Sequence, residues 1–364
     1  DTLDDNIQGP QSLKDVRHPQ VLLNNLSIAR KQGDKKVISR TLLDIGSKYV
    51  GMGRHFYAQL YFGQALSINR EIKDLRGEGE ALTAISIAYR HIGLYKKSRE
   101  YSEQALIINR MVGNHRNEVD VLSNIGMVFE VFGRYDKALE YLTRAKTVKL
   151  KISDQRRESD ILVNIGIVYR SLNQNTNALK FFGQALEIKR KVKDRYGEGW
   201  TLNNIGVMHL YSGNYPEAMK YFNLALGIQR DIHNLRGEGR VLSNIGNVYR
   251  NLGNNDKTLK YYRQALEFTR QLEDWYGEGI ARFNLGEIYS NLNQYSKALE
   301  YYEQSLVLLS RLGTTDSIWR AWSFLATAAC IILAVLVTQP TTNSKQTQQI
   351  ALVKNQILVI LLLI

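Results

Sequence analysis

A repeat with a period of 40 residues constrains the fold of this chain more than any other feature of its sequence. The clearest copy runs from Gly197 to Arg230 and reads GEGWTLNNIGVMHLYSGNYPEAMKYFNLALGIQR. Such a fixed period is the sequence signature of a solenoid or another repeat architecture. Its glycine column is Gly46, Gly126, Gly166, Gly206, Gly246 and Gly286, with Ser86 in the gap, and its alanine column is Ala65, Ala105, Ala145, Ala185, Ala225 and Ala265, ending on Ser305.

Each unit predicts two helices, because its small and apolar residues fall twice at i, i+3, i+4 and i+7. Between the two stripes, Gly213 suits the left-handed residue that ends a helix, and Pro216 suits the first turn of the next helix. The unit is therefore a helical hairpin. The two stripes are Leu202, Ile205, Gly206 and His209, and then Ala218, Tyr221, Phe222 and Ala225.

The period divides the chain into three parts. Residues 1–13 are polar and aperiodic, and we expect a disordered lead-in. Residues 14–313 form the repeat array, and residues 314–364 form a hydrophobic tail. The array opens on a half repeat at 14–34 and continues with full repeats at 35–74, 75–114, 115–154, 155–194, 195–234, 235–274 and 275–313.

The joints between units carry capping residues in register. A polar residue at each joint predicts a helix N-cap, and a glutamate four residues later faces the positive end of the helix dipole. An arginine near the end of each second helix is expected to pair with that glutamate, and paired glycines predict close approach of a neighbouring backbone. The caps are Asp74, Asn114, Asp154, Asp194, Asn234 and Asp274, and the arginines are Arg70, Arg110, Arg190, Arg230 and Arg270.

Small residues at Gly206, Ala218 and Ala225 with Leu202, Tyr211 and Phe222 between them resemble the tetratricopeptide repeat (TPR). The longer period is similar to the arrays of LGN/Pins-type adaptors and kinesin light chains. The resemblance implies an all-α, right-handed α-solenoid of about seven hairpins, preceded by a half-repeat helix and followed by an apolar C-terminal helix. It also implies a superhelical groove, lined mainly by the first helices, in which a peptide lies.

Composition narrows the partners and disfavours catalysis. The 48 Lys and Arg residues exceed the 35 Asp and Glu residues, which gives a formal net charge of +13. That surplus favours an acidic peptide, an anionic membrane or nucleic acid, although solvated basic residues give the same total. Cys330 is the single cysteine, so a multi-thiolate metal site is excluded. No metalloprotease, nucleophile-elbow or phosphate-loop motif occurs, so we expect neither an enzyme nor a cofactor.

Two columns of the first helices are candidate peptide-binding residues. Asparagine offers both a donor and an acceptor, so a ladder of amides could hold the backbone of an extended peptide. The alternative is that these amides bond neighbouring helices within the array. The arginines could bind acidic side chains of a ligand through paired hydrogen bonds. The alternative is that they are solvated surface residues. The columns are Asn124, Asn164, Asn204, Asn244 and Asn284, and Arg90, Arg170 and Arg250.

Trp200 and Arg240 occupy matching positions early in the first helices of consecutive units. An aromatic residue beside an arginine is typical of a binding hot spot. The alternative for Trp200 is that it fills a packing gap.

The tail departs from the repeat. Residues 321–338 carry no charge and, as a helix, would extend about 27 Å, close to the hydrocarbon thickness of a bilayer. We favour a transmembrane helix over a helix that caps the last repeat, because a cap needs a polar outer face.

The sequence therefore predicts a non-enzymatic scaffold or adaptor that binds an acidic peptide segment of another protein. We expect a cytoplasmic repeat domain anchored to a membrane by residues 321–338. The alternatives are a nucleic-acid-binding repeat protein, and a structural protein that self-associates in oligomer assembly with the tail as a capping helix.

Overall fold

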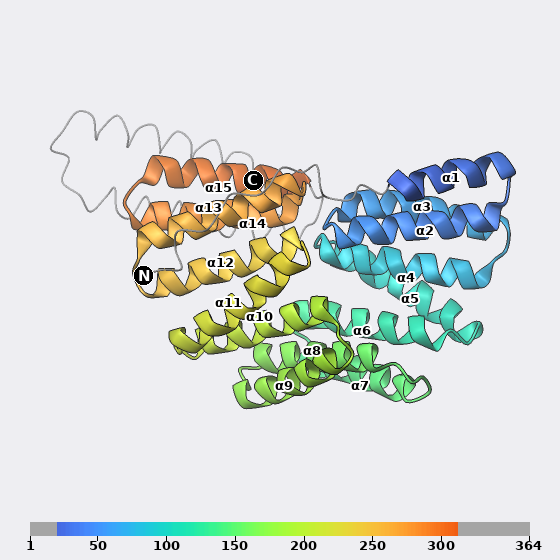
Figure 1. Ribbon diagram of the computed structural model, residues 1–364, viewed down its shortest axis with the longest axis horizontal. Coiled ribbons are helices and arrows are strands. Elements are labelled where there is room, and N and C mark those ends of the chain that lie inside the picture. Colours follow the sequence, from blue (N-terminus) through green and yellow to red (C-terminus); the bar gives the residue numbers. More distant parts are fainter. Residues whose placement is uncertain (1–19, 312–364) are drawn as a thin grey trace.

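The computed structural model describes residues 20–311, and this part of the chain is entirely α-helical outside its turns (Figure 1). Its helices are α1 (Gln20–Gln32), α2 (Lys35–Gly51), α3 (His55–Glu71), α4 (Leu75–His91), α5 (Tyr95–Met111), α6 (His115–Val131), α7 (Tyr135–Lys149), α8 (Gln155–Ser171), α9 (Asn175–Lys191), α10 (Arg195–Tyr211), α11 (Tyr215–Asp231), α12 (Leu235–Asn251), α13 (Asn255–Gln271), α14 (Trp275–Asn291) and α15 (Tyr295–Arg311).

The helices pack as consecutive hairpins. After the single helix α1, the pairs run from α2 with α3 to α14 with α15, and each pair packs against the next. The prediction of an all-α solenoid with a leading half repeat and seven hairpins is confirmed. The array curves back on itself, so that α1–α5 form one arm, α11–α15 form the other, and α6–α10 connect them (Figure 1).

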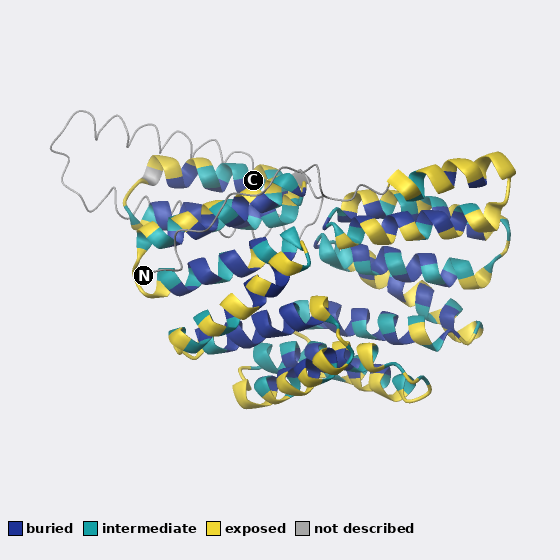
Figure 2. Ribbon diagram, viewed as in Figure 1, coloured by how far each residue is buried: buried dark blue, intermediate teal, exposed yellow. Residues whose placement is uncertain are grey.

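The small residues of the repeat let the two helices of a hairpin close together. A Cβ atom added to Gly206 would lie 2.7 Å from Cδ1 of Phe222, and one added to Gly166 would lie 2.6 Å from Cε1 of Phe182. Beside this contact a stacked ring pair recurs in every hairpin, with centroids 5.3 to 5.5 Å apart, and His209 stacks on Tyr221 as its aromatic counterparts do. Within residues 20–311 the buried residues form four clusters that follow one another along the array, the two largest reaching from α1 to α8 and from α8 to α13 (Figure 2).

The turns recur at intervals of half a repeat unit. Residues with positive φ recur 20 positions apart from Gly33 to Asn293, with Ser153 as the exception. Ser153 lies in the joint after α7, which ends early, at Lys149. Glycine fills only part of the series, because Lys73, Asn173, Lys193, His233, Glu273 and Asn293 adopt the same left-handed conformation.

The predicted joint chemistry is confirmed. Each predicted cap accepts a hydrogen bond from the backbone N–H three residues later, as Asp194 does from Gly197. The arginines pair with the glutamates eight residues on, at 2.7 to 3.6 Å, as in Arg190 with Glu198.

The expectation of a close backbone approach at the paired glycines is wrong, because what comes close is a side chain. A Cβ atom on Gly77 would lie 2.7 Å from Oδ1 of Asn69, and one on Gly199 would lie 2.6 Å from Nε2 of Gln229. Both side chains come from the ends of adjacent second helices, so the missing Cβ makes room for a buried polar group.

No helix within residues 20–311 is long and apolar enough to cross a membrane. The predicted transmembrane helix at 321–338 and the predicted lead-in at 1–13 lie outside the described residues.

Candidate functional site

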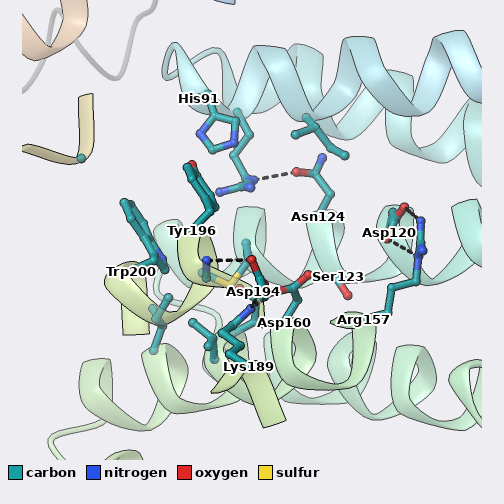
Figure 3. Close-up of a pocket in the computed structure, with 18 of the residues that line it drawn as sticks. His91, Asp120, Ser123, Asn124, Arg157, Asp160, Lys189, Asp194, Tyr196 and Trp200 are labelled. Carbon is teal, nitrogen blue, oxygen red and sulfur yellow. Dashed lines mark hydrogen bonds and ion pairs between the residues drawn. The ribbon is translucent and has the colours of Figure 1, made fainter. Parts of the chain in front are cut away.

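The inner face of the array encloses a cavity of about 380 Å³, which we term the central cavity (Figure 3). Its walls come from the first helices α4, α6, α8, α10 and α12, together with Lys189 at the end of α9. The cavity therefore lies where the family resemblance predicts the ligand groove. Its described lining includes Arg90, His91, Asn124, Asn164, Trp200 and Arg240.

One end of the central cavity is lined by ion pairs (Figure 3). Arg157 donates to both carboxylate oxygens of Asp120, at 2.9 and 2.8 Å, and also contacts Asp154 at 2.7 Å. The Asp120 carboxyl has a raised pKa, because burial outweighs the opposing hydrogen bond from Arg157. The charges at this end are matched within the protein.

Lys189 is the least expected residue of the site. Its side chain is 2% exposed, and Nζ lies 2.6 Å from Asp160 and 3.2 Å from the cap residue Asp194. It stands where Asn69, Asn109 and Gln229 stand in other units, all of them buried. That column of polar residues at the end of the second helices is the signal in the sequence that could have identified it.

At the other end of the cavity, Arg240 of α12 stacks on Trp200 of α10. The guanidinium carbon lies 4.3 Å from the centroid of the indole ring. Burial within the cavity and the nearby Arg236 lower the pKa of Arg240 to about 10. The predicted hot-spot pair therefore lines the cavity as one unit.

The asparagine column is divided between the cavity and the inter-unit contacts. Asn124 is 2% exposed and donates to the hydroxyls of Ser98 and Ser102, each at 3.0 Å. Asn204 donates to the carbonyl of Trp200, at 3.1 Å. Asn164 lines the central cavity. In the later units Asn244 donates to Asn203 at 2.8 Å, and Asn284 lies on α14, which is not part of the cavity wall.

The arginine column joins the asparagine column rather than standing apart from it. Arg90 donates from Nε to Oδ1 of Asn124 at 2.6 Å, and Arg170 donates to Oδ1 of Asn204 at 3.3 Å. Arg250 instead pairs with Glu287 at 2.9 Å. Of these three arginines, only Arg90 lines the central cavity.

Beside the cavity the two arms touch, in a contact that we term the seam. Arg236 donates to Nε2 of His55, and the ring centroids of Phe56 and Trp275 lie 5.8 Å apart. The nearby carboxylate of Glu273 raises the pKa of Tyr57. The seam thus joins α3 of the first hairpin to the sixth and seventh hairpins.

The seam surrounds two histidines with cations. His55 stacks on His91, with centroids 4.8 Å apart. Burial, together with Arg236, Arg90 and Arg240, lowers the pKa of His55 to about 2, and the same causes lower the pKa of His91. Both imidazoles are therefore neutral at physiological pH.

Among residues 20–311, no three His, Cys, Asp or Glu side chains converge on a metal position. The described residues of the site can bind a ligand through aromatic stacking, hydrogen bonds and charge.

The sequence matches the family model described as Tetratricopeptide repeat at residues 78–151, 157–231 and 238–329, together more than half of the chain. No curated protein matches the chain.

Among solved structures, the fold is similar to that of PH0952 from Pyrococcus horikoshii, a signal transduction ATPase with numerous domains and a tetratricopeptide repeat sensor. The TM-score is 0.55 at 17% identity, over 93% of this chain and 52% of that one. Apo RapI gives a TM-score of 0.54 at 18% identity, over 75% and 98% of the two chains. A Rap protein complexed with Competence and Sporulation Factor gives a TM-score of 0.54 at 16% identity, over 86% of this chain and 95% of that one. These identities show a shared fold alone.

Proposed function

Because the chain belongs to the tetratricopeptide repeat family, we propose that it is an interaction scaffold that binds a peptide segment of another protein in the central cavity. The observation that carries this proposal is the cavity itself, which the first helices of consecutive units enclose. A cavity of about 380 Å³ has room for a few ligand side chains and falls within the usual range for ligand sites. The remainder of an extended peptide would continue along the groove.

We propose that the peptide is acidic. Arg240 and Arg90 line the cavity, and within the described part of the chain neither is in an ion pair. The chain as a whole carries a formal net charge of +13, which favours encounter with an acidic segment. Trp200 adds an aromatic surface of the kind that dominates binding hot spots.

The predicted columns contribute to this site unequally. Asn164, Arg90, Trp200 and Arg240 are offered as contact residues, since all four line the cavity. Asn124 and Asn204 act by holding arginines in place, because their amides are already bonded within the array. We propose no catalytic step, and anchoring of the repeat domain to a membrane through residues 321–338 stays a prediction.

The test is a selection of displayed 12-residue peptides on the full chain, solubilised in mild detergent, followed by fluorescence anisotropy on the peptides recovered. We expect acidic peptides to be enriched and to lose affinity in Trp200→Ala. Arg230→Gln is the control, because Arg230 pairs with Glu238 at a joint, away from the cavity. Recovery of peptides that bind Trp200→Ala as well as the native chain would contradict the assignment to this cavity.

A further inference from the structure

Three arginines from distant units line the same end of the central cavity. Arg90 comes from α4 in the second hairpin, whereas Arg236 and Arg240 come from α12 in the sixth. They are brought together because the array curves until its first hairpin meets its sixth, as the hydrogen bond from Arg236 to His55 shows. This group belongs to no single repeat.

The positive charge of this group is poorly balanced by the protein. Arg236 is the one of the three that is in an ion pair within the described residues, at 3.5 Å from Asp274. Arg90 is hydrogen-bonded to the neutral amide of Asn124, and Arg240 rests on the face of Trp200. Among the described residues, three guanidinium groups thus share one ion-paired carboxylate.

Two other cations of the cavity wall have more carboxylates around them. Arg157 meets Asp120 and Asp154, and Lys189 meets Asp160 and Asp194, so each of these two cations has two carboxylates within 3.2 Å. His55 and His91 lie beside the three arginines, and their lowered pKa values favour the neutral imidazole, so they add no positive charge of their own. Among the described residues, the three arginines therefore have fewer ion-paired carboxylates than Arg157 and Lys189 have, although the charge of Glu130 also acts on Arg90.

We infer that Arg90, Arg236 and Arg240 together bind one carboxylate of the acidic peptide, an inference that rests on the proposed function. Guanidinium groups bind carboxylates through paired N–H donors, and among the described residues Arg90 donates to a side chain only through its Nε, to Asn124. A carboxylate at this position contacts both arms at once. Binding of the peptide is then coupled to closure of the array at the seam.

The experiment uses an acidic peptide recovered from the display selection, labelled with fluorescein and titrated with the full chain. Each Asp or Glu of the peptide is replaced in turn by Asn or Gln, and a separate peptide carries an amidated C-terminus. These two arms distinguish an acidic side chain from the terminal carboxylate as the bound group. Every peptide is measured against the native chain, Arg90→Gln, Arg240→Gln and the control Arg230→Gln.

We expect one substitution of the peptide to weaken binding to the native chain and to the Arg230→Gln control by about 10-fold to 100-fold. The same substitution should weaken binding to Arg240→Gln and Arg90→Gln by a smaller factor than in the native chain, because one of the three arginines that bind the carboxylate is already lost. Arg240→Lys keeps the positive charge but lacks the paired N–H donors of a guanidinium group. Its affinity for the peptide should lie between those of the native chain and Arg240→Gln, and this result separates a loss of recognition from a loss of folding.

Equal losses in the native and Arg→Gln chains for every acidic group would overturn the carboxylate site while leaving peptide binding intact. Failure of every displayed peptide to bind the native chain would instead overturn the proposed function itself.

Discussion

The guanidinium carbon of Arg240 lies 4.3 Å from the centroid of the Trp200 ring, although the two residues occupy the same position in consecutive repeats. Stacked first helices place equivalent residues beside one another on the inner face of the array. A position that is Asp120 and Asp160 in earlier units thus becomes an aromatic and cationic pair in later ones. The repeat supplies the geometry, and the individual residues supply the chemistry.

Replacement of Trp200 by Leu is expected to weaken binding of a selected acidic peptide by about 30-fold, corresponding to about 2 kcal/mol at a hot spot. The physical reason is loss of both the aromatic contact and the surface that orients Arg240. Fluorescence anisotropy gives the affinity, and Tyr211→Leu is the control, since Tyr211 is 72% exposed and does not line the cavity. Equal affinities for the two variants would contradict this role.

Gly206→Ala is expected to lower the free energy of unfolding by about 1 to 3 kcal/mol. Its Cβ would lie 2.7 Å from the Phe222 ring, so α10 and α11 must move apart. Gly227→Ala in α11 is the matched control, since no atom lies within 4 Å of its Cβ position. There the substitution should stabilise the helix by about 0.5 to 1 kcal/mol. Urea denaturation measures the free energy of unfolding of both variants. If Gly227→Ala destabilised the protein as much as Gly206→Ala, the result would be inconsistent with this packing.

Acidification is expected to destabilise the protein through His55. Its folded pKa of about 2 lies below the ordinary value of 6.5, so between these pH values the unfolded chain binds more protons. The associated stability is present above pH 6.5 and is lost as the pH falls towards 2, with about 1.4 kcal/mol lost by pH 5.5.

The variant His55→Phe retains a ring that can stack on His91 and removes the proton acceptor. The difference between its free energies of unfolding at pH 7.5 and pH 5.5 should be smaller than that of the native chain by about 1.4 kcal/mol. Identical pH dependence in both proteins would show that His55 does not remain neutral in the folded state.

The seam is expected to hold the two arms at a defined separation. Spin labels at Leu60→Cys and Leu252→Cys, two exposed positions on opposite arms, report that distance in a chain that also carries Cys330→Ser. Phe56→Ala removes the ring beside Trp275 and should broaden the distribution of distances, whereas Val307→Ala, at an exposed position of α15, should not. Binding of an acidic peptide should narrow the distribution of distances in the native chain. An unchanged width in Phe56→Ala would show that the ring contact does not restrain the arms.

The fold could be predicted from the sequence because neighbouring units interact at fixed offsets. The cap of Asp194 on Gly197 and the pairing of Arg190 with Glu198 both recur with the period. Because local geometry determines these contacts, they can be predicted from each copy of the repeat that carries the same residues.

The site could be predicted only in part, because not all of its contacts follow the period. Arg90 reaches Asn124 across an offset of 34 residues, which recurs between Arg170 and Asn204, whereas Arg236 reaches His55 across 181. The second contact depends on how far the array curves over several units, which is the sum of small rotations at each joint. Trp200 and Arg240 could be recognised as departures from their column, whereas the partners of Arg90 could not.

The most direct test of the central claim is photo-crosslinking from the wall of the cavity. Benzoylphenylalanine is placed at Ile167, which lines the central cavity, or at Leu224, which is 48% exposed on the second helix α11. The account predicts that a selected acidic peptide crosslinks from position 167 and not from position 224. Crosslinking from position 224 alone would place the peptide on the outer face and contradict the account.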